Sequence, residues 1–182
     1  MEIGKTLYVK SRKEWRRWLA KNHAKAKEIW LIYFKKHTGK PRIPYNDAVE
    51  EALCYGWIDS TAKRVDDERT AQRYTPRREG SGVSEMNLER ARRLVKNGRM
   101  TRFGIEKIKV HLMKKSELPE DIIRAVRKDA EAWANYRKFS DTYKRIRIGF
   151  IEGARGRPKM FKRRLEYFLK MTKKGKKFGM VQ

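Results

Sequence analysis

The segment PYNDAVEEALCYGWIDSTAKRVDDERTAQRYTPRR, from Pro44 to Arg78, decides the fold of this 182-residue chain. Its first half places apolar residues at i, i+1, i+4 and i+5 from Ala48, the spacing of one helical face, and Gly56 suits the end of that helix. Trp57–Val65 and Thr70–Thr75 then read as two strands around a charged turn. The segment therefore predicts a helix that leads into a β-hairpin.

The residues before this segment add a strand, a helix and a second strand. Thr6–Val9 is a short β-prone run, and Ser11 followed by Glu14 has the capping-box spacing for a helix over Arg12–Lys21. Glu28–Phe34 is almost unbroken in its apolar, β-branched and aromatic residues, which indicates a strand covered on both faces. We expect an α+β fold in which a small, mostly antiparallel sheet is packed with helices.

The residues after the hairpin are helical in pattern. Five helices are predicted, on the faces marked by Leu88, Ala91, Leu94 and Val95, by Thr101–Met113, by Ile122, Val126, Ala130 and Trp133, by Ser140–Ala154, and by Phe161, Leu165, Phe168 and Leu169. We therefore divide the chain into an α+β domain at residues 1–113, a helical C-terminal module at 114–172, and a basic flexible tail at 173–182.

The chain carries a large excess of positive charge. It contains 48 Lys and Arg against 22 Asp and Glu, a net charge of +26. Half of this excess lies in residues 137–182, where 16 basic residues stand against 3 acidic ones, a net of +13. Charge of one sign repels itself and disfavours the compact state unless a polyanion offsets it. We therefore expect the chain to bind a polyanion.

The basic residues expected to contact this polyanion lie in the second hairpin strand and around the last helix. Arginine forks match phosphate oxygens, and an aromatic ring among them offers a base a stacking surface. The predicted nucleic-acid-binding residues are Arg73, Tyr74, Arg77, Arg78, Arg155, Arg157, Lys159, Lys162, Arg163 and Lys170. The alternative is a solvated charged face without a ligand.

The sequence contains no motif for reading bases in order. It has no helix-turn-helix spacing, zinc-finger motif or RNP signature. We therefore expect binding by shape and charge, to RNA in preference to DNA, with the ribosome as one candidate partner.

A second candidate site lies where the predicted helix meets the hairpin. The residues of this pocket are Tyr45, Trp57, Asp59 and Asn87. A small-molecule enzyme that uses Asp59 is the function they would suggest. The simpler interpretation is an ion pair between Asp59 and Arg73 or Arg77 that fixes the register of the hairpin.

Other chemistry finds little support in the sequence. Cys54 is the one cysteine, so no disulfide forms within the chain, and its place in a helix favours a small buried hydrophobe over a nucleophile. The three histidines have no partner at metal-ligand spacing. We expect a non-enzymatic protein with no catalytic residues, metal or cofactor. Because no run approaches about 18 apolar residues, we expect no membrane span, and a cytoplasmic setting.

Five segments resemble a known family. They are EIWLIYFKK at Glu28–Lys36, YNDAVEEALCYGWIDS at Tyr45–Ser60, RYTPRR at Arg73–Arg78, LVKNGRM at Leu94–Met100 and FIEGAR at Phe150–Arg155. On these segments the chain resembles the bacteriocin-protection, YdeI/OmpD-associated family over nearly its whole length.

The resemblance implies an α+β domain with a helical extension. Val83 stands where that family usually has tryptophan, and Phe150-Ile151 stands where it has Trp-Ile. The family name suggests an alternative function, a stress- or toxic-peptide-protection adaptor that contacts another protein. The resemblance assigns no catalytic residue.

Overall fold

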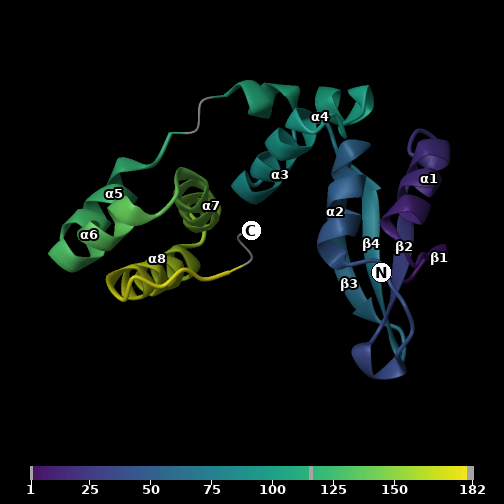
Figure 1. The fold of residues 1–182 in the computed structure, drawn as a ribbon, viewed down its shortest axis with the longest axis horizontal. Coiled ribbons are helices and arrows are strands. Elements are labelled where there is room, and N and C mark those ends of the chain that lie inside the picture. Colours follow the sequence, from purple (N-terminus) through teal and green to yellow (C-terminus); the bar gives the residue numbers. More distant parts are fainter. Residues whose placement is uncertain (1, 115–116, 180–182) are drawn as a thin grey trace. The chain divides into compact units, whose positions relative to one another are not determined.

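The computed structural model of the chain describes residues 2–114 and 117–179. It divides into two compact units, Met1–Gly82 with Arg90–Leu112 and Val83–Glu89 with Met113–Gln182, and helix α3 contributes to both (Figure 1). The first unit contains the sheet, and the second is built from helices. The predicted α+β class with a helical C-terminal part is therefore confirmed.

Strands and helices alternate in the first part of the chain, and helices follow without further strands among the described residues. The elements are β1 (Thr6–Tyr8), α1 (Arg12–Asn22), β2 (Ile29–Phe34), a 3₁₀ turn (Lys36–Thr38), α2 (Tyr45–Cys54), β3 (Trp57–Arg64), β4 (Arg69–Pro76), α3 (Glu85–Lys96), α4 (Arg102–Met113), α5 (Glu120–Arg127), α6 (Ala130–Lys138), α7 (Asp141–Glu152) and α8 (Pro158–Lys173).

The four strands form one sheet in the order β1-β2-β4-β3. β1 runs parallel to β2, and the other two pairs are antiparallel, with Ile29 opposite Tyr74 and Phe34 opposite Arg69. The five residues of β2 from Ile29 to Tyr33 are all buried, which confirms a strand covered on both faces. The sheet is therefore mostly antiparallel, as predicted.

The two faces of the sheet pack differently because side chains alternate along each strand. Leu31 and Tyr33 of β2 face α1 and α2, together with Tyr74 of β4. Trp30 and Ile32 face the opposite side, where Ala71 and the partly buried Ile3, Tyr8 and Phe34 pack against them. One layer of helices thus covers one face of the sheet.

Helix ends in the first unit follow the predicted signals. The Ser11 side chain accepts a hydrogen bond from the Glu14 backbone N–H at 3.3 Å and caps α1. Gly56 has a φ of 71°, a conformation that side chains disfavour, and turns the chain from α2 into β3.

Val95 was expected on the buried face of α3 but is 43 % exposed, because the core face of that helix consists of Leu88, Ala91 and Leu94.

The second unit contains one helix more than its sequence pattern predicted. Ile122, Val126, Ala130 and Trp133 were placed on a single helix, but the chain breaks into α5 and α6. The Asp129 side chain accepts from the Ala132 backbone N–H at 3.0 Å and begins a new helix there. Ser140 caps α7 as predicted.

The helices of the second unit bury an aromatic core. Phe168 of α8 is fully buried against residues of α5, α6 and α7, and Phe161, Leu165 and Leu169 of α8 are partly buried against the same cluster. The ring of Phe178 lies 4.8 Å from that of Tyr167, and the Phe178 backbone N–H donates to the Tyr143 hydroxyl at 3.3 Å. The chain after α8 therefore follows the helices as far as Gly179.

The domain boundaries predicted from the sequence, and the flexibility of the tail at 173–182, stay predictions. The last three residues of that tail lie outside the described residues, as do residues 115 and 116 of the helical module. Among the helices of residues 2–114 and 117–179, none combines the length and apolarity that a bilayer crossing requires. The same residues contain no group of three or more His, Cys, Asp or Glu side chains arranged to hold a metal ion.

Candidate nucleic-acid interface

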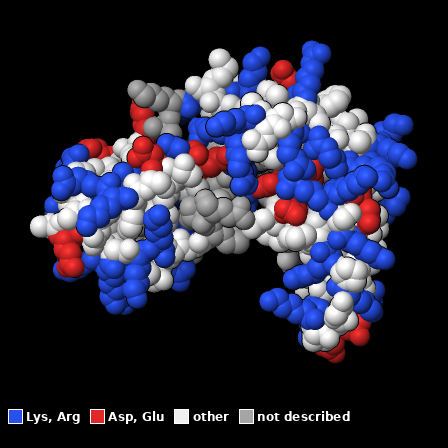
Figure 2. Space-filling view, in the orientation of Figure 1, with Lys and Arg blue, Asp and Glu red and all other residues white. Residues whose placement is uncertain are grey.

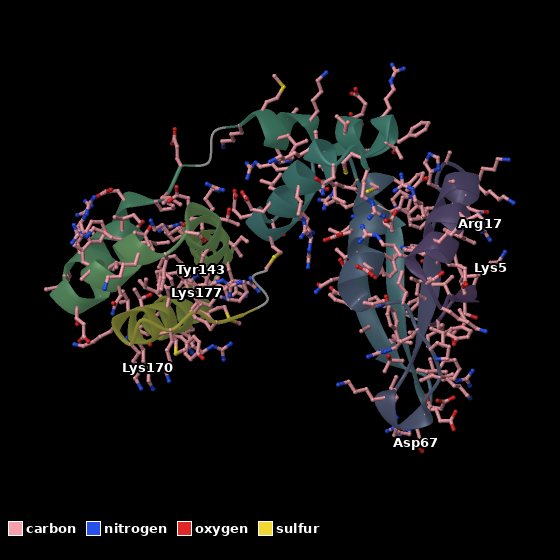
Figure 3. The ribbon with its side chains drawn as sticks, in the orientation of Figure 1. Lys5, Arg17, Asp67, Tyr143, Lys170 and Lys177 are labelled. Carbon is pink, nitrogen blue, oxygen red and sulfur yellow. The ribbon has the colours of Figure 1, made fainter. Side chains whose placement is uncertain are left out.

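Helix α8 separates its apolar and basic residues on two faces. Pro158 occupies its first turn, where a missing N–H costs nothing, and Phe168 marks the face turned to the core. The outward face contains Lys159, Lys162, Arg163 and Lys170, which we call the α8 basic face. All four side chains are exposed, and Lys170 projects away from the helices (Figure 3). Lys and Arg gather over α8 in the space-filling view (Figure 2).

Acidic side chains neutralise little of the α8 basic face. Glu166 is the one acidic residue of α8, and its carboxylate lies 3.9 Å from the Lys162 amine. Both of these side chains are more than 60 % exposed, so the pair is screened by water. Across residues 2–114 and 117–179, Lys159, Arg163 and Lys170 have no acidic partner within 4 Å. Their charge is therefore available to an anion.

Arg155, another predicted site residue, already forms ion pairs with carboxylates of the second unit. Its guanidinium donates to both carboxylate oxygens of Asp121 at 3.0 Å and to Glu152 at 2.6 and 2.7 Å. Its hydrogen bond lowers the pKa of the Asp121 carboxyl below its usual value. Arg157 donates to the Gly153 carbonyl at 3.2 Å. Arg155 therefore ties the end of α7 to α5, and its charge is already compensated.

The hairpin arginines belong to the first unit, and the structure changes their interpretation. Arg73 donates to Glu28 at 2.5 and 2.8 Å, and this ion pair lowers the pKa of the Glu28 carboxyl. The Tyr74 ring is fully buried, 5.4 Å from the Trp15 ring, so the prediction that it stacks on a base is wrong. Arg77 is only 3 % exposed, whereas Arg78 is exposed. Of the three arginines, Arg78 alone is exposed and has no acidic partner within 4 Å among the residues that the structure describes.

No ion pair within 4 Å joins Asp59 to Arg73 or Arg77 in the described part of the chain, although the negative charge of Asp59 raises the pKa of the Arg77 guanidinium against the larger effect of burial. Asp59 is opposite Tyr74 in the β3–β4 register, so the neighbouring Arg73 points to the other face of the sheet. Asp59 instead accepts a 2.6 Å hydrogen bond from the Tyr45 hydroxyl. Arg77 donates to the Gly82 carbonyl at 2.9 Å, and burial lowers the pKa of its guanidinium.

The four residues predicted for the second site have different surroundings. Burial, and then the bond to Asp59, raise the pKa of Tyr45. Trp57 is 1 % exposed and donates through Nε1 to the His23 carbonyl at 3.1 Å. Asn87 belongs to the second unit, where its backbone N–H donates to the Ser84 hydroxyl at 3.3 Å.

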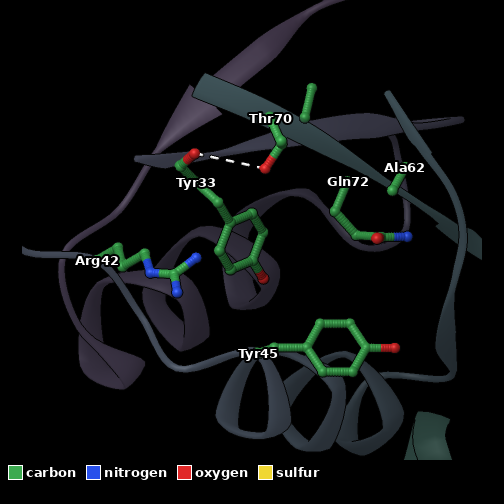
Figure 4. Close-up of a pocket in the computed structure, with 7 residues that line it drawn as sticks. Tyr33, Arg42, Tyr45, Ala62, Thr70 and Gln72 are labelled. Atoms are coloured by element: carbon green, nitrogen blue, oxygen red, sulfur yellow. Dashed lines mark hydrogen bonds between the residues drawn. The ribbon is translucent and has the colours of Figure 1, made fainter. Parts of the chain in front are cut away.

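Tyr45 lines a pocket of about 150 Å³ on the helix side of the sheet (Figure 4). The other lining residues are Tyr33, Arg42, Ala62, Thr70, Ala71 and Gln72. Among the described residues none accepts a hydrogen bond from the buried Gln72 amide nitrogen, and the adjoining pocket is large enough for a water molecule to do so. Asp59 is not among the lining residues, so this pocket does not provide the carboxylate that the enzyme alternative required.

Cys54 is fully buried near the end of α2. Burial, and then the negative charge of Glu51, raise the pKa of its thiol to about 11. The thiolate is the nucleophilic form of cysteine, and it is scarce at neutral pH when the pKa is this high. The interpretation of Cys54 as a buried hydrophobe is consistent with this setting.

Sequence reasoning missed a buried charge network in the first unit. Glu51 is fully buried and accepts hydrogen bonds from Arg12 at 2.5 Å, Arg16 at 2.7 Å and Arg99 at 2.6 Å. Its neighbour Glu50 is 6 % exposed and pairs with Arg12 and Arg93. Two carboxylates within an apolar helical pattern were the available signal, because buried carboxylates require cationic partners. These arginines are therefore structural, despite the excess of charge.

Comparison with protein families assigns the two parts of the chain separately. The model for a domain of unknown function (DUF8412) matches residues 7–107, which is more than half of the chain. The chain belongs to the DUF8412 family. The model described as Bacteriocin-protection, YdeI or OmpD-Associated matches residues 115–175.

These matches confirm the resemblance to the YdeI/OmpD-associated family and also restrict it. Four of the five segments that suggested the resemblance lie within residues 28–100, which the DUF8412 match covers. The YdeI/OmpD-associated match covers only the helical C-terminal part. No curated protein and no solved structure matches the chain.

Proposed function

We propose that this protein binds RNA through the phosphate backbone, using the α8 basic face, and that it does not read the base sequence. The observation that carries the proposal is the charge balance on that face, where Lys159, Lys162, Arg163 and Lys170 are exposed and Glu166 is the single acid. A positive stripe of this kind attracts phosphates and releases their counterions on binding. Arginines whose charge is already paired with carboxylates, such as Arg155, are not part of this proposed interface.

The charge continues beyond the helix. Lys174, Lys176 and Lys177 are exposed, and the backbone N–H of Lys176 donates to the Met171 carbonyl at 2.9 Å. Folded RNA is recognised largely by its shape and by contacts to its backbone, which suits a helix followed by a basic segment. A structured RNA such as that of the ribosome is the proposed partner, and the cytoplasm is the proposed setting.

Contact with another protein is the second candidate function. The description of the family matched by residues 115–175 names bacteriocin protection, which would suit an adaptor. Val110 and Met113, three residues apart on α4, are 79 % and 78 % exposed, and adjoining apolar surface of this kind suits a protein partner better than RNA. This candidate predicts that V110D abolishes a specific protein complex and leaves RNA binding unchanged.

Filter binding with two matched variants tests the RNA proposal. The first variant, K159Q/K162Q/R163Q/K170Q, removes the charge of the α8 basic face. The control, K5Q/K13Q/R17Q/K21Q, removes three lysines and one arginine that are also exposed but lie in the first unit; Lys5 and Arg17 are labelled in Figure 3. Each is measured against a folded RNA and a DNA duplex of equal length in the same buffer.

We expect the wild-type protein to bind the RNA more tightly than the DNA. We expect the α8 variant to lose at least about tenfold in affinity at physiological salt, and the control to lose little. Equal loss in both variants would show that only net charge matters and would refute an interface on α8. Failure of the wild-type protein to bind either nucleic acid would refute the proposal altogether.

A further inference from the structure

A groove of about 810 Å³ lies in the first unit, apart from all the residues assigned to RNA above. It runs between the loop after α1, the end of α2 and the start of α4. Its walls include the rings of His23, Tyr55, Trp57 and Phe103. The His23 ring centroid lies 4.5 Å from that of Phe103 and 5.2 Å from that of Tyr55. A volume of roughly 300–1,000 Å³ is usual for a ligand site.

The groove is a consequence of how α4 meets α2. Thr101 donates to the Cys54 carbonyl through its backbone N–H at 3.2 Å and through its hydroxyl at 2.5 Å. Gly104 permits this close approach, since a Cβ there would overlap the Cys54 carbonyl. The first turn of α4 is thereby fixed beside Tyr55, and the Phe103 side chain remains 58 % exposed.

The rim of the groove is basic. Lys25 and Lys27 come from the loop after α1, and Arg102 and Lys107 come from α4, whereas Glu106 is the one acidic lining residue. Within the described part of the chain, none of these four cations has an acidic partner within 4 Å, in contrast to the arginines around Glu51. The first turn of α4 contains no acid, so the positive end of the helix dipole adds to this potential.

His23 adds an unsatisfied polar atom to the aromatic wall. Its Nδ1 lies 2.9 Å from the Leu19 carbonyl, which can only accept, so Nδ1 carries a proton. In the neutral ring Nε2 is then an acceptor, and it is buried without a hydrogen-bond partner among the residues that the structure describes. A base amine or a ribose hydroxyl is the kind of donor that would satisfy it.

We propose that this groove binds an unstacked nucleotide of single-stranded RNA. Its base stacks on Phe103, and its phosphates lie at the rim formed by Lys25, Lys27, Arg102 and Lys107. Aromatic rings combined with free cations are the means by which proteins hold single strands without sequence preference. This inference deepens the proposed RNA binding and rests on it, because α8 would hold folded RNA while the groove takes an unpaired segment.

Fluorescence anisotropy with two labelled RNAs tests the groove. One probe is oligouridine, which cannot pair with itself, and the other is a blunt RNA duplex. Phe103→Leu removes the aromatic ring but keeps an apolar side chain, and Phe103→Tyr restores a ring. Val110→Ala is the matched control, because Val110 is exposed on the same helix and does not line the groove. Circular dichroism confirms that each variant is folded.

We expect F103L to weaken oligouridine binding by about 5-fold to 150-fold, with little change for the duplex. F103Y and V110A should bind as the wild-type protein does. If F103L binds oligouridine as tightly as the wild-type protein does, while RNA still binds through α8, the proposed role of the groove is refuted and the proposed function stands. An equal loss on both probes would also overturn it, and loss of all RNA binding by the wild-type protein would refute both proposals.

Two further measurements, of salt dependence and of competition, identify the ligand of the groove. Lys27→Gln should lower the slope of log K against log salt for oligouridine by about one, whereas Lys109→Gln, which changes an exposed lysine of α4 that does not line the groove, should not. Uridine monophosphate competes weakly if the groove holds a strand. Competition by the free nucleotide, or by an acidic peptide, at concentrations as low as those of oligouridine would overturn the assignment to single-stranded RNA.

Discussion

Replacement of Glu51 by glutamine is expected to destabilise the first unit strongly. The carboxylate is 0 % exposed and accepts three charge-assisted hydrogen bonds from Arg12, Arg16 and Arg99. Burial acts to lower the pKa of Arg12, but hydrogen bonds to Glu51 and Glu50 outweigh it, and the net pKa is raised. Glutamine keeps the shape of the side chain and removes its charge.

The magnitude follows from these contacts. Each hydrogen bond to a charged group contributes about 1.5–3 kcal/mol, but the three are coupled and cannot be summed. The arginine side chains are 23 %, 34 % and 40 % exposed, so water partly solvates them when the carboxylate is lost. Removal of one partner from a buried pair typically costs about 3–5 kcal/mol, and we expect E51Q to lie in this range.

Urea unfolding followed by tryptophan fluorescence measures this change. With an m value of about 2 kcal/mol/M, the unfolding midpoint of the first unit should fall by roughly 2 M. Glu68→Gln is the control, since Glu68 is 56 % exposed and lies 3.4 Å from Lys40, and it should cost less than about 1 kcal/mol. If E51Q proved as stable as E68Q, the network would not be the support described above.

Three further predictions concern the same unit. Gly104→Ala should cost about 1–3 kcal/mol in unfolding free energy, because an ideal Cβ lies 2.8 Å from the Leu53 carbonyl oxygen, while Gly82→Ala, with nothing within 4 Å, should be nearly neutral. Cys54 should react slowly with iodoacetamide at pH 8 in the native protein and rapidly in urea, because burial raises the pKa of its thiol to about 11; rapid stoichiometric labelling of native protein would contradict this. Burial raises the pKa of Tyr33 to about 12, so the folded state keeps a proton that the unfolded state releases near pH 10; stability should fall between pH 10 and 12, and Y33F should reduce that slope.

Local signals predicted the elements of this fold well. Ser11, Ser140 and Gly56 marked helix ends because capping is decided within one turn of the chain. The run IWLIYF predicted a central strand because burial on both faces leaves no alternation. The break between α5 and α6 was missed, although Asp129 carried the cap signal, because the apolar spacing continued across it.

The candidate site depended on information that is not local. Tyr74 and Arg73 are adjacent in the sequence but lie on opposite faces of the sheet, and which face is buried depends on the packing of α1 and α2. The pairing of Arg155 joins residues 34 positions apart. Charge counts therefore located an excess of cations but could not show which cations were already compensated by carboxylates.

The salt dependence of RNA binding tests the central claim most directly. Four phosphate contacts at the α8 basic face should contribute about 3 to the slope of log K against log salt, or roughly 60-fold in affinity between 50 and 200 mM salt. We expect K159Q/K162Q/R163Q/K170Q to lower the wild-type slope by about this amount, and K5Q/K13Q/R17Q/K21Q to leave it nearly unchanged. A wild-type slope near zero, or one that the α8 substitutions do not change, would contradict the account.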